Sequence, residues 1–467
     1  MAILAGYMVP HPPMILPQVG RGAEADIQTT IDAYRSVAAE IADLEPETII
    51  VSSPHTVMYQ DYNHISPGHG AYGDMSRFGA PGLSLQVAYD EEVRRKVCSD
   101  AEKAGLRAGT AGERERHLDH GTFIPLWFVE QAYRERKKDV SYKVLRVGLS
   151  GLSLLDHYAL GILLAKAVND LGRRAVFIAS GDLSHYLKEE GPYGFREEGP
   201  VYDERIMKTM GTGNFGELFD YSPDFCEMAG ECGHRSFTIM AGAFDCTAVR
   251  THVYSHEDVT GVGYGIISVY PEGYDASRNF GEQYVERHDA YLAERKANED
   301  AYVQLARKTV ETYVKEGPEA SVEMDVPQEM KDRKAGVFVS LHIDGQLRGC
   351  IGTIEGVREN IAAEIIGNAV SACARDPRFS PVTEAELPFL EYSVDVLGET
   401  EPVSDPSELD VKRYGVIVTN GARRGLLLPN LDGVRDVEQQ IAIARQKAGI
   451  RESEPVQLER FEVVRHN

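Results

Sequence analysis

Three short apolar runs in the first part of the chain end at turn residues, and a histidine follows each of them. The runs cover residues 2–8, 48–51 and 175–180. Runs of this length that are rich in β-branched and aromatic residues predict buried strands of an α/β sheet. Ligands of open α/β sheets bind beyond the carboxyl ends of the strands. The three histidines are therefore predicted to share one polar pocket at that edge, namely His11, His55 and His185.

The segments between these runs predict helices and further strands. Apolar residues recur at helical intervals over residues 23–44, 91–104 and 154–171, whereas 143–149 and 262–270 are strand-like. This β-α-β order predicts an α/β domain with a central sheet. Residues 60–84 are rich in Gly, Pro, Ser and Tyr. They predict a long loop over the strand ends, where substrate contacts are common.

The second part of the chain has a different pattern. Asp344-Gly345 separates two alternating runs, which predicts a β-hairpin. Helical and strand-like segments alternate around it, so residues 299–467 are predicted to form an α+β domain with its own core. Residues 276–298 are polar and have no apolar period, and we interpret them as a linker. The first domain would then cover residues 1–275.

Composition restricts the class of protein. The 467 residues suffice for two or three domains, and 43% hydrophobic with 26% charged residues is typical of a soluble globular protein. A net charge of -24 argues against nucleic-acid binding. Six scattered cysteines without a CxxC pair suit reduced thiols in a cytosol. With no signal-peptide pattern and no apolar run near the roughly 20 residues of a membrane helix, we expect a cytoplasmic protein. The oligomeric state stays open, a homo-oligomer included.

The strand-end histidines point to a metal site. Two histidines and one carboxylate on one face of an ion leave positions open for substrate and dioxygen, as in non-haem Fe(II) oxygenases. His11 and His55 are the first two predicted ligands. For the third we prefer Glu231 to the adjacent Cys232, because a thiolate favours zinc or copper(I) over iron. Fe(II) is thus the predicted cofactor, with copper or zinc as alternatives. A carboxylate at the start of a buried helix can equally be a cap.

Two further histidines have candidate roles outside the metal. A histidine near its unperturbed pKa suits proton transfer, so His185 is the predicted acid-base residue, with Asp182 orienting it or stabilising its charge. The segment from His117 to His120 has two interpretations. Asp119 can cap a helix, or His120 can enter the pocket as a hydrogen-bond donor.

Four motifs of the first domain resemble those of the class III (LigB-type) extradiol catechol dioxygenases and the related Memo proteins, in the same order. They are Val9-Pro10-His11-Pro12-Pro13, Ser53-Pro54-His55, Asp119-His120-Gly121 and Gly181-Asp182-Leu183-Ser184-His185. The resemblance covers residues 2–272. It implies His11 and His55 as iron ligands, His185 as the acid-base residue and His120 as a donor to the substrate, a small aromatic diol that reacts with O2. Memo-like members have Cys-Gly where this chain has Cys232-Gly233, whereas the dioxygenases use a glutamate.

The second domain is similar to the AMMECR family across residues 299–465. The resemblance rests on Leu347-Arg348-Gly349-Cys350-Ile351-Gly352-Thr353, Asp376-Pro377-Arg378-Phe379 and Gly425-Leu426-Leu427-Leu428-Pro429. The fusion resembles the AmmeMemoRadiSam system, which implies a radical-SAM protein as partner. Three functions therefore compete. We rank a ring-cleaving dioxygenase first, ahead of a Memo-like iron or copper protein without ring cleavage and of a partner module for a radical-SAM enzyme.

Overall fold

The computed structural model describes residues 2–112, 114, 116–431 and 433–467. The chain divides into two compact units, Met1–Arg287 and His288–Asn467. Each unit has its own cluster of buried apolar side chains. Within the described residues, no helix has both the length and the apolar character that crossing a membrane requires.

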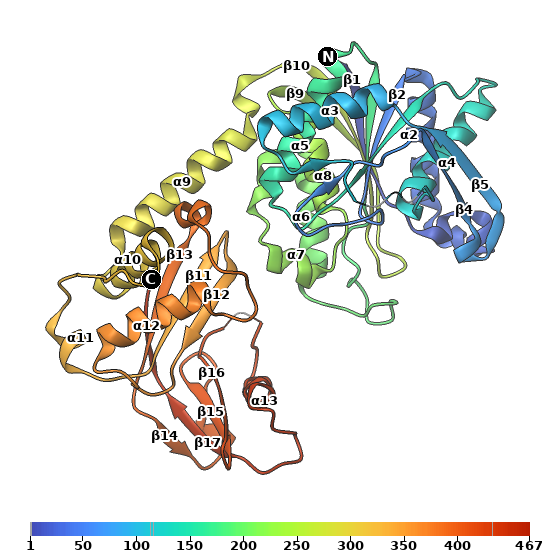
Figure 1. Ribbon diagram of the computed structural model, residues 1–467. Coiled ribbons are helices and arrows are strands. Elements are labelled where there is room, and N and C mark those ends of the chain that lie inside the picture. The colour runs from blue at the N-terminus through green and yellow to red at the C-terminus, as the bar shows by residue number, and fades with distance from the viewer. Residues whose placement is uncertain (1, 113, 115, 432) are drawn as a thin grey trace. The chain divides into compact units, whose positions relative to one another are not determined.

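A six-stranded mixed sheet forms the centre of the first unit (Figure 1). Its order is β7-β2-β8-β1-β10-β9. Strands β7, β2, β8 and β1 are parallel, whereas β10 and β9 run antiparallel at one side. The predicted α/β class with a central sheet is confirmed. The bounds are β1 (Ile3–Val9), β2 (Thr48–Ser53), β7 (Lys143–Gly148), β8 (Ala175–Ser180), β9 (Thr247–Glu257) and β10 (Tyr264–Tyr274).

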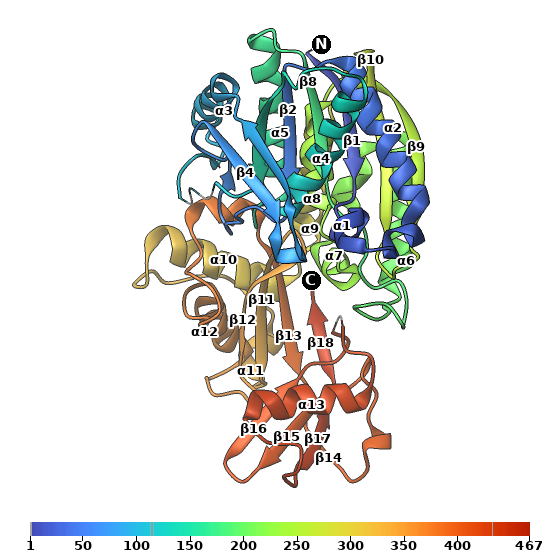
Figure 2. The same ribbon diagram turned by 90° about the vertical axis from the view of Figure 1, so that its right-hand side faces the viewer.

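Helices cover both faces of this sheet (Figure 2). Helices α2 (Gln28–Leu44) and α4 (His120–Glu135) pack on one face through one apolar cluster. A second cluster joins the other face to α3 (Glu91–Ala104), α5 (Leu154–Asp170) and α8 (His234–Ala243). The unit also contains the helices α1 (Pro17–Gly20), α6 (Glu198–Thr212) and α7 (Pro223–Ala229).

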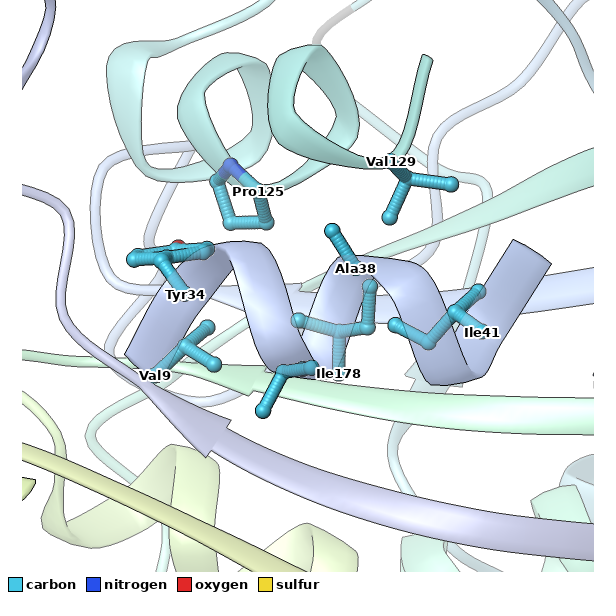
Figure 3. Close-up of a pocket in the computed structure, with 8 residues that line it drawn as sticks. Val9, Tyr34, Ala38, Ile41, Pro125, Val129 and Ile178 are labelled. Atoms are coloured by element: carbon cyan, nitrogen blue, oxygen red, sulfur yellow. The ribbon is translucent and has the colours of Figure 1, made fainter. Parts of the chain in front are cut away.

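The packing of α2 and α4 against the sheet is tight. Figure 3 shows Tyr34, Ala38 and Ile41 of α2 beside Pro125 and Val129 of α4, above the strands. The cavity between them measures about 10 Å³, which is at most the space of one water molecule. The space between these two helices and the strands is therefore packed core and too small for a substrate.

The register of the parallel strands aligns their carboxyl ends. Val9 of β1 lies opposite Ser180 of β8, and Ser52 of β2 lies opposite Ala179. Residues that follow these three strands therefore meet at one edge of the sheet, as the sequence predicts. Strands β1, β2 and β8 have continuous apolar runs because both of their faces are buried.

One segment of the first unit differs from its sequence prediction. Much of the predicted loop at 60–84 belongs to a hairpin of β4 (Gly70–Met75) and β5 (Ala80–Ala88), joined by a short 3-10 turn, Ser76–Phe78. The segment also holds β3 (Asn63–His64), which pairs with β6 (Ala108–Gly109). The Gly and Pro content concealed this hairpin, although alternate side chains of β5 are buried.

The second unit contains two four-stranded sheets, of order β12-β11-β13-β18 and β14-β17-β15-β16. The predicted Asp344-Gly345 hairpin is confirmed, and both turn residues have positive φ, as a type I′ turn requires. The α+β class is confirmed as well. Its strands are β11 (Val337–Ile343), β12 (Gln346–Gly352), β13 (Glu391–Leu397), β14 (Glu401–Val403), β15 (Gly415–Asn420), β16 (Arg423–Leu427), β17 (Gln457–Phe461) and β18 (Val463–His466). Its helices are α10 (Ala301–Glu316), α11 (Gln328–Asp332), α12 (Ile361–Ala374) and α13 (Val437–Ala448).

Most of the predicted linker is a helix, α9 (Phe280–Asn298). Its many Glu, Ala, Arg and Lys residues favour a helix, and little of its surface is buried, so no apolar period is needed. The boundary between the compact units falls inside this helix. Independent folding of the two parts stays a prediction.

Candidate metal centre

Three candidate residues each follow a strand of the central sheet, and each lies two residues beyond the end of its strand. His11 lies two residues beyond β1, His55 two beyond β2, and Asp182 two beyond β8. Prolines interrupt the first two segments at once, so the strands cannot continue past the edge. The structure thus brings the strand-end residues together, as the sequence predicts.

The imidazoles of His11 and His55 face each other through their Nε2 atoms, which are 2.9 Å apart. Ser180 Oγ donates to the Gly121 carbonyl, so the 2.9 Å contact between His11 Nδ1 and Ser180 Oγ has His11 as donor. This tautomer leaves a lone pair on His11 Nε2. Burial lowers the pKa of both histidines, which keeps them in the neutral form that binds metals. Two nitrogens bound at a right angle to one ion at about 2.1 Å would be about 3.0 Å apart, so this pair fits one ion.

Cys232 completes a group of three close donors. Its Sγ lies 3.7 Å from His11 Nε2, and one donor atom from each of His11, His55 and Cys232 lies within 4.8 Å of the others. The Asp182 amide donates to Cys232 Sγ at 3.2 Å, which fixes the sulfur at this edge. Burial raises the pKa of the Cys232 thiol, whereas a bound cation would deprotonate it.

Glu231, the preferred third ligand in the sequence analysis, lies outside this group. Its carboxylate accepts the His234 amide at 2.5 Å, at the start of α8. Burial raises the pKa of Glu231, and this hydrogen bond opposes the shift. Among the described residues, the close groups of possible ligands contain Cys232 and lack Glu231. The geometry therefore favours the alternative ligand, because the glutamate serves the helix end instead.

Asp182 and His185 form a second close group of possible ligands with Cys232. Asp182 Oδ1 accepts the His11 amide at 2.8 Å, so this carboxylate positions a histidine of the first group. His185 Nε2 is buried and has no hydrogen-bond partner in the described part of the chain. Its ring stacks on Tyr193, with centroids 5.2 Å apart. Burial lowers the pKa of His185, so its free nitrogen can accept a proton.

The two interpretations of the segment from His117 to His120 are compatible, because Asp119 caps a helix and His120 lies beside His55. Asp119 is the N-cap of α4 and accepts the Thr122 amide at 2.9 Å. The cap places His120 in the first turn, where its ring stacks on His55 at a centroid distance of 4.0 Å. Burial, together with His55 and His11, lowers the pKa of His120 to about 3. A neutral His120 can donate one hydrogen bond into the site.

A cavity of about 510 Å³ opens beside His55 and His120. The β4–β5 hairpin closes part of it with Asp74, Met75, Arg77 and Phe78. The composition of residues 60–84 indicates the location of this wall but not which side chains form it. The sequence analysis also missed Arg146 of β7, which is buried and lies 4.0 Å from the Asp119 carboxylate. Nothing in a strand motif distinguishes such an arginine from an exposed one.

Comparison with known proteins agrees with this architecture. Residues 5–267 match the family described as the catalytic LigB subunit of aromatic ring-opening dioxygenase, and residues 303–466 match AMMECR1. The chain belongs to the LigB family and carries an AMMECR1 domain behind its LigB domain.

Individual relatives cover different shares of the chain. Protein CA_C1420 of Clostridium acetobutylicum is 40% identical over 475 residues, which span 100% of this chain and 99% of that protein. A Thermotoga maritima protein is 49% identical over 170 residues, 36% of this chain and 98% of its own. The 2-aminophenol 1,6-dioxygenase beta subunit of a Pseudomonas species is 25% identical over 290 residues, 57% of this chain and 93% of the subunit.

Proposed function

We propose that the first unit is a non-haem Fe(II)-dependent extradiol dioxygenase that opens a catechol-like or aminophenol-like aromatic ring with O2. One observation carries the proposal. Two neutral imidazoles stand 2.9 Å apart at a strand edge, beside a cavity large enough for an aromatic ring. The LigB family and the 2-aminophenol dioxygenase relative support the same class of reaction. Such an activity would be expected in the cytoplasm.

His11, His55 and Cys232 would hold the iron. Bound iron would supply the redox chemistry that couples dioxygen to an aromatic diol. Two imidazoles and one thiolate fit iron incompletely, because a thiolate is a softer ligand than the carboxylate of typical iron oxygenases. Because Cys232 lies close to both imidazoles whereas Glu231 accepts the amide of His234, we place Cys232 ahead of Glu231 as third ligand. Iron remains the first metal to test.

The remaining groups would act on the substrate. The free Nε2 of His185 would accept the proton of a substrate hydroxyl and return it as the ring opens. His120, neutral at pH 7, would donate a hydrogen bond to a substrate oxygen. Phe78, whose ring centroid lies 5.3 Å from that of His120, would help to exclude water above the ring.

The test uses the full chain loaded anaerobically with Fe(II). Catechols and 2-aminophenols are then screened for dioxygen uptake and for absorption of ring-opened products. His185→Ala should lower the rate about 10²–10⁴-fold while iron stays bound, because general acid-base catalysis contributes that much. His11→Ala should lose the iron, and the exposed His252→Ala serves as control. Iron-replete wild type that consumes no dioxygen with any of these substrates would refute ring cleavage.

A second candidate is a Memo-like metal protein that binds copper or iron without ring cleavage. The observation in its favour is Cys232, because a thiolate beside two imidazoles suits copper(I) and zinc. The AMMECR1 domain adds the third candidate, a partner module for a radical-SAM protein. Co-purification of such a protein with a chain that shows no oxygen uptake would favour the third candidate over the first.

A further inference from the structure

The five candidate ligands form two triads that share one sulfur atom. The first consists of His11, His55 and Cys232, and the second of Asp182, His185 and Cys232. Within each triad, one donor atom per residue lies within 4.8 Å of the other two. The proposed iron site uses only the first triad, so the second has no ligand assigned to it.

The donor atoms of the second triad are available. His185 Nε2 is buried and has no hydrogen-bond partner among the described residues, which is costly for a polar atom unless a ligand satisfies it. Asp182 uses Oδ1 for the His11 amide, and its Oδ2 lies 4.0 Å from His11 Nε2 on the side of the metal group. The Asp182 amide already donates to Cys232 Sγ, which keeps carboxylate and sulfur on one short segment.

The chemistry of this triad favours a borderline cation. Imidazole, carboxylate and thiolate are the three ligand types of protein zinc sites, and three of them leave a fourth position for water. A thiolate sulfur has lone pairs for two ions. One thiolate and one carboxylate also offset part of the charge that two cations bring to a buried site.

We propose that this chain binds a second metal ion of the zinc type at Asp182, His185 and Cys232, with the Cys232 sulfur bridging it to the ion held by His11 and His55. The second ion occupies the same Nε2 of His185 that ring opening needs for proton transfer. Zinc at this site therefore inhibits the proposed dioxygenase activity. The second site shares the Cys232 sulfur and His185 with the proposed function, but zinc binding at this site is measured independently of ring opening.

The test measures zinc bound to the metal-free, full-length chain by equilibrium dialysis and elemental analysis. Wild type should bind two ions per chain, and His185→Ala should bind one. Asp182→Asn keeps the oxygen that accepts the His11 amide but removes the charge, so it should also bind one. The matched control is His252→Ala, an exposed histidine of β9, which should still bind two. Wild type that binds one ion, or His185→Ala that still binds two, would overturn the second site.

Cobalt(II) tests the shared sulfur. Each of His11→Ala and His185→Ala should retain one cobalt ion with a thiolate-to-cobalt absorption band, and Cys232→Ser should lose the band. A band confined to one of the two histidine variants would overturn the bridge. These results distinguish the second site from the proposed function. A chain that binds one ion and opens the ring would refute only the second site. A chain that binds two ions and opens no ring would refute only the dioxygenase activity.

Discussion

Gly181 keeps two segments of the candidate metal site in close contact, so adding a methyl group there tests the geometry of that site. It lies between β8 and Asp182, and its backbone passes directly against that of Gly233. A Cβ added at Gly181 would lie 2.1 Å from Gly233 Cα and 3.1 Å from Gly233 N. Carbon atoms in favourable contact are about 3.5–4.0 Å apart, so Gly233 would need to retreat by more than about 1 Å. Because the obstacle is backbone, no side-chain rotation can relieve the clash.

The displacement is transmitted to Cys232. The amide of Asp182 donates to Cys232 Sγ at 3.2 Å, and the amide of Cys232 donates back to the Asp182 carbonyl at 3.4 Å. Metal-ligand distances tolerate only about 0.2 Å of error, so a shift of more than about 1 Å removes the sulfur from the ion. Overpacking of a close contact also costs about 1–3 kcal/mol of stability.

Gly181→Ala should therefore lose about 1–3 kcal/mol in urea unfolding and most of its bound metal after desalting. The control is Gly82→Ala on β5, where an added Cβ meets no atom within 4 Å. It should match wild type in both measurements. If Gly181→Ala retains metal and stability as Gly82→Ala does, the close approach does not position the cysteine, and the reasoning fails.

Three further predictions concern ligands, domains and pH. Cys232→Ser should lose iron on desalting while Glu231→Gln retains it; the reverse pattern would restore the glutamate as ligand. Fragments Met1–Arg287 and His288–Asn467 should each unfold cooperatively in urea, and aggregation of both would indicate a shared core. His157 is a buried residue of α5, and burial lowers its pKa to about 4. Its neutral form therefore stabilises the fold fully above the unfolded pKa of about 6.5, and up to about 3 kcal/mol of the free energy of unfolding is lost as pH falls toward 4. Unfolding curves at pH 7 and pH 5 should show a smaller loss in His157→Gln, and equal losses in both proteins would contradict this assignment.

The strands that position the candidate site could be predicted because both of their faces are buried. Strands β1, β2 and β8 have continuous apolar runs because helices cover both faces, so both their existence and their shared edge could be predicted. Strand β9 was not predicted, because it is an edge strand whose side chains are mostly half-buried or exposed, so it has no continuous apolar run. Helix α9 was missed for a related reason, since a helix that buries little has no apolar period to detect.

The choice between Glu231 and Cys232 as candidate third ligand could not be made from the sequence, because these two adjacent residues have competing uses that only the backbone path distinguishes. Gly230, with φ of 65°, ends α7 and turns the chain, and α8 begins after Gly233, an N-cap without a side chain to accept its first amides. Those amides need an acceptor, and Glu231 supplies one to His234. The carboxylate is therefore engaged before any metal arrives, while the neighbouring sulfur is left at the strand edge. A glutamate shortly before a helix with a glycine N-cap should be interpreted as a cap first and as a ligand only where a second acceptor serves the helix.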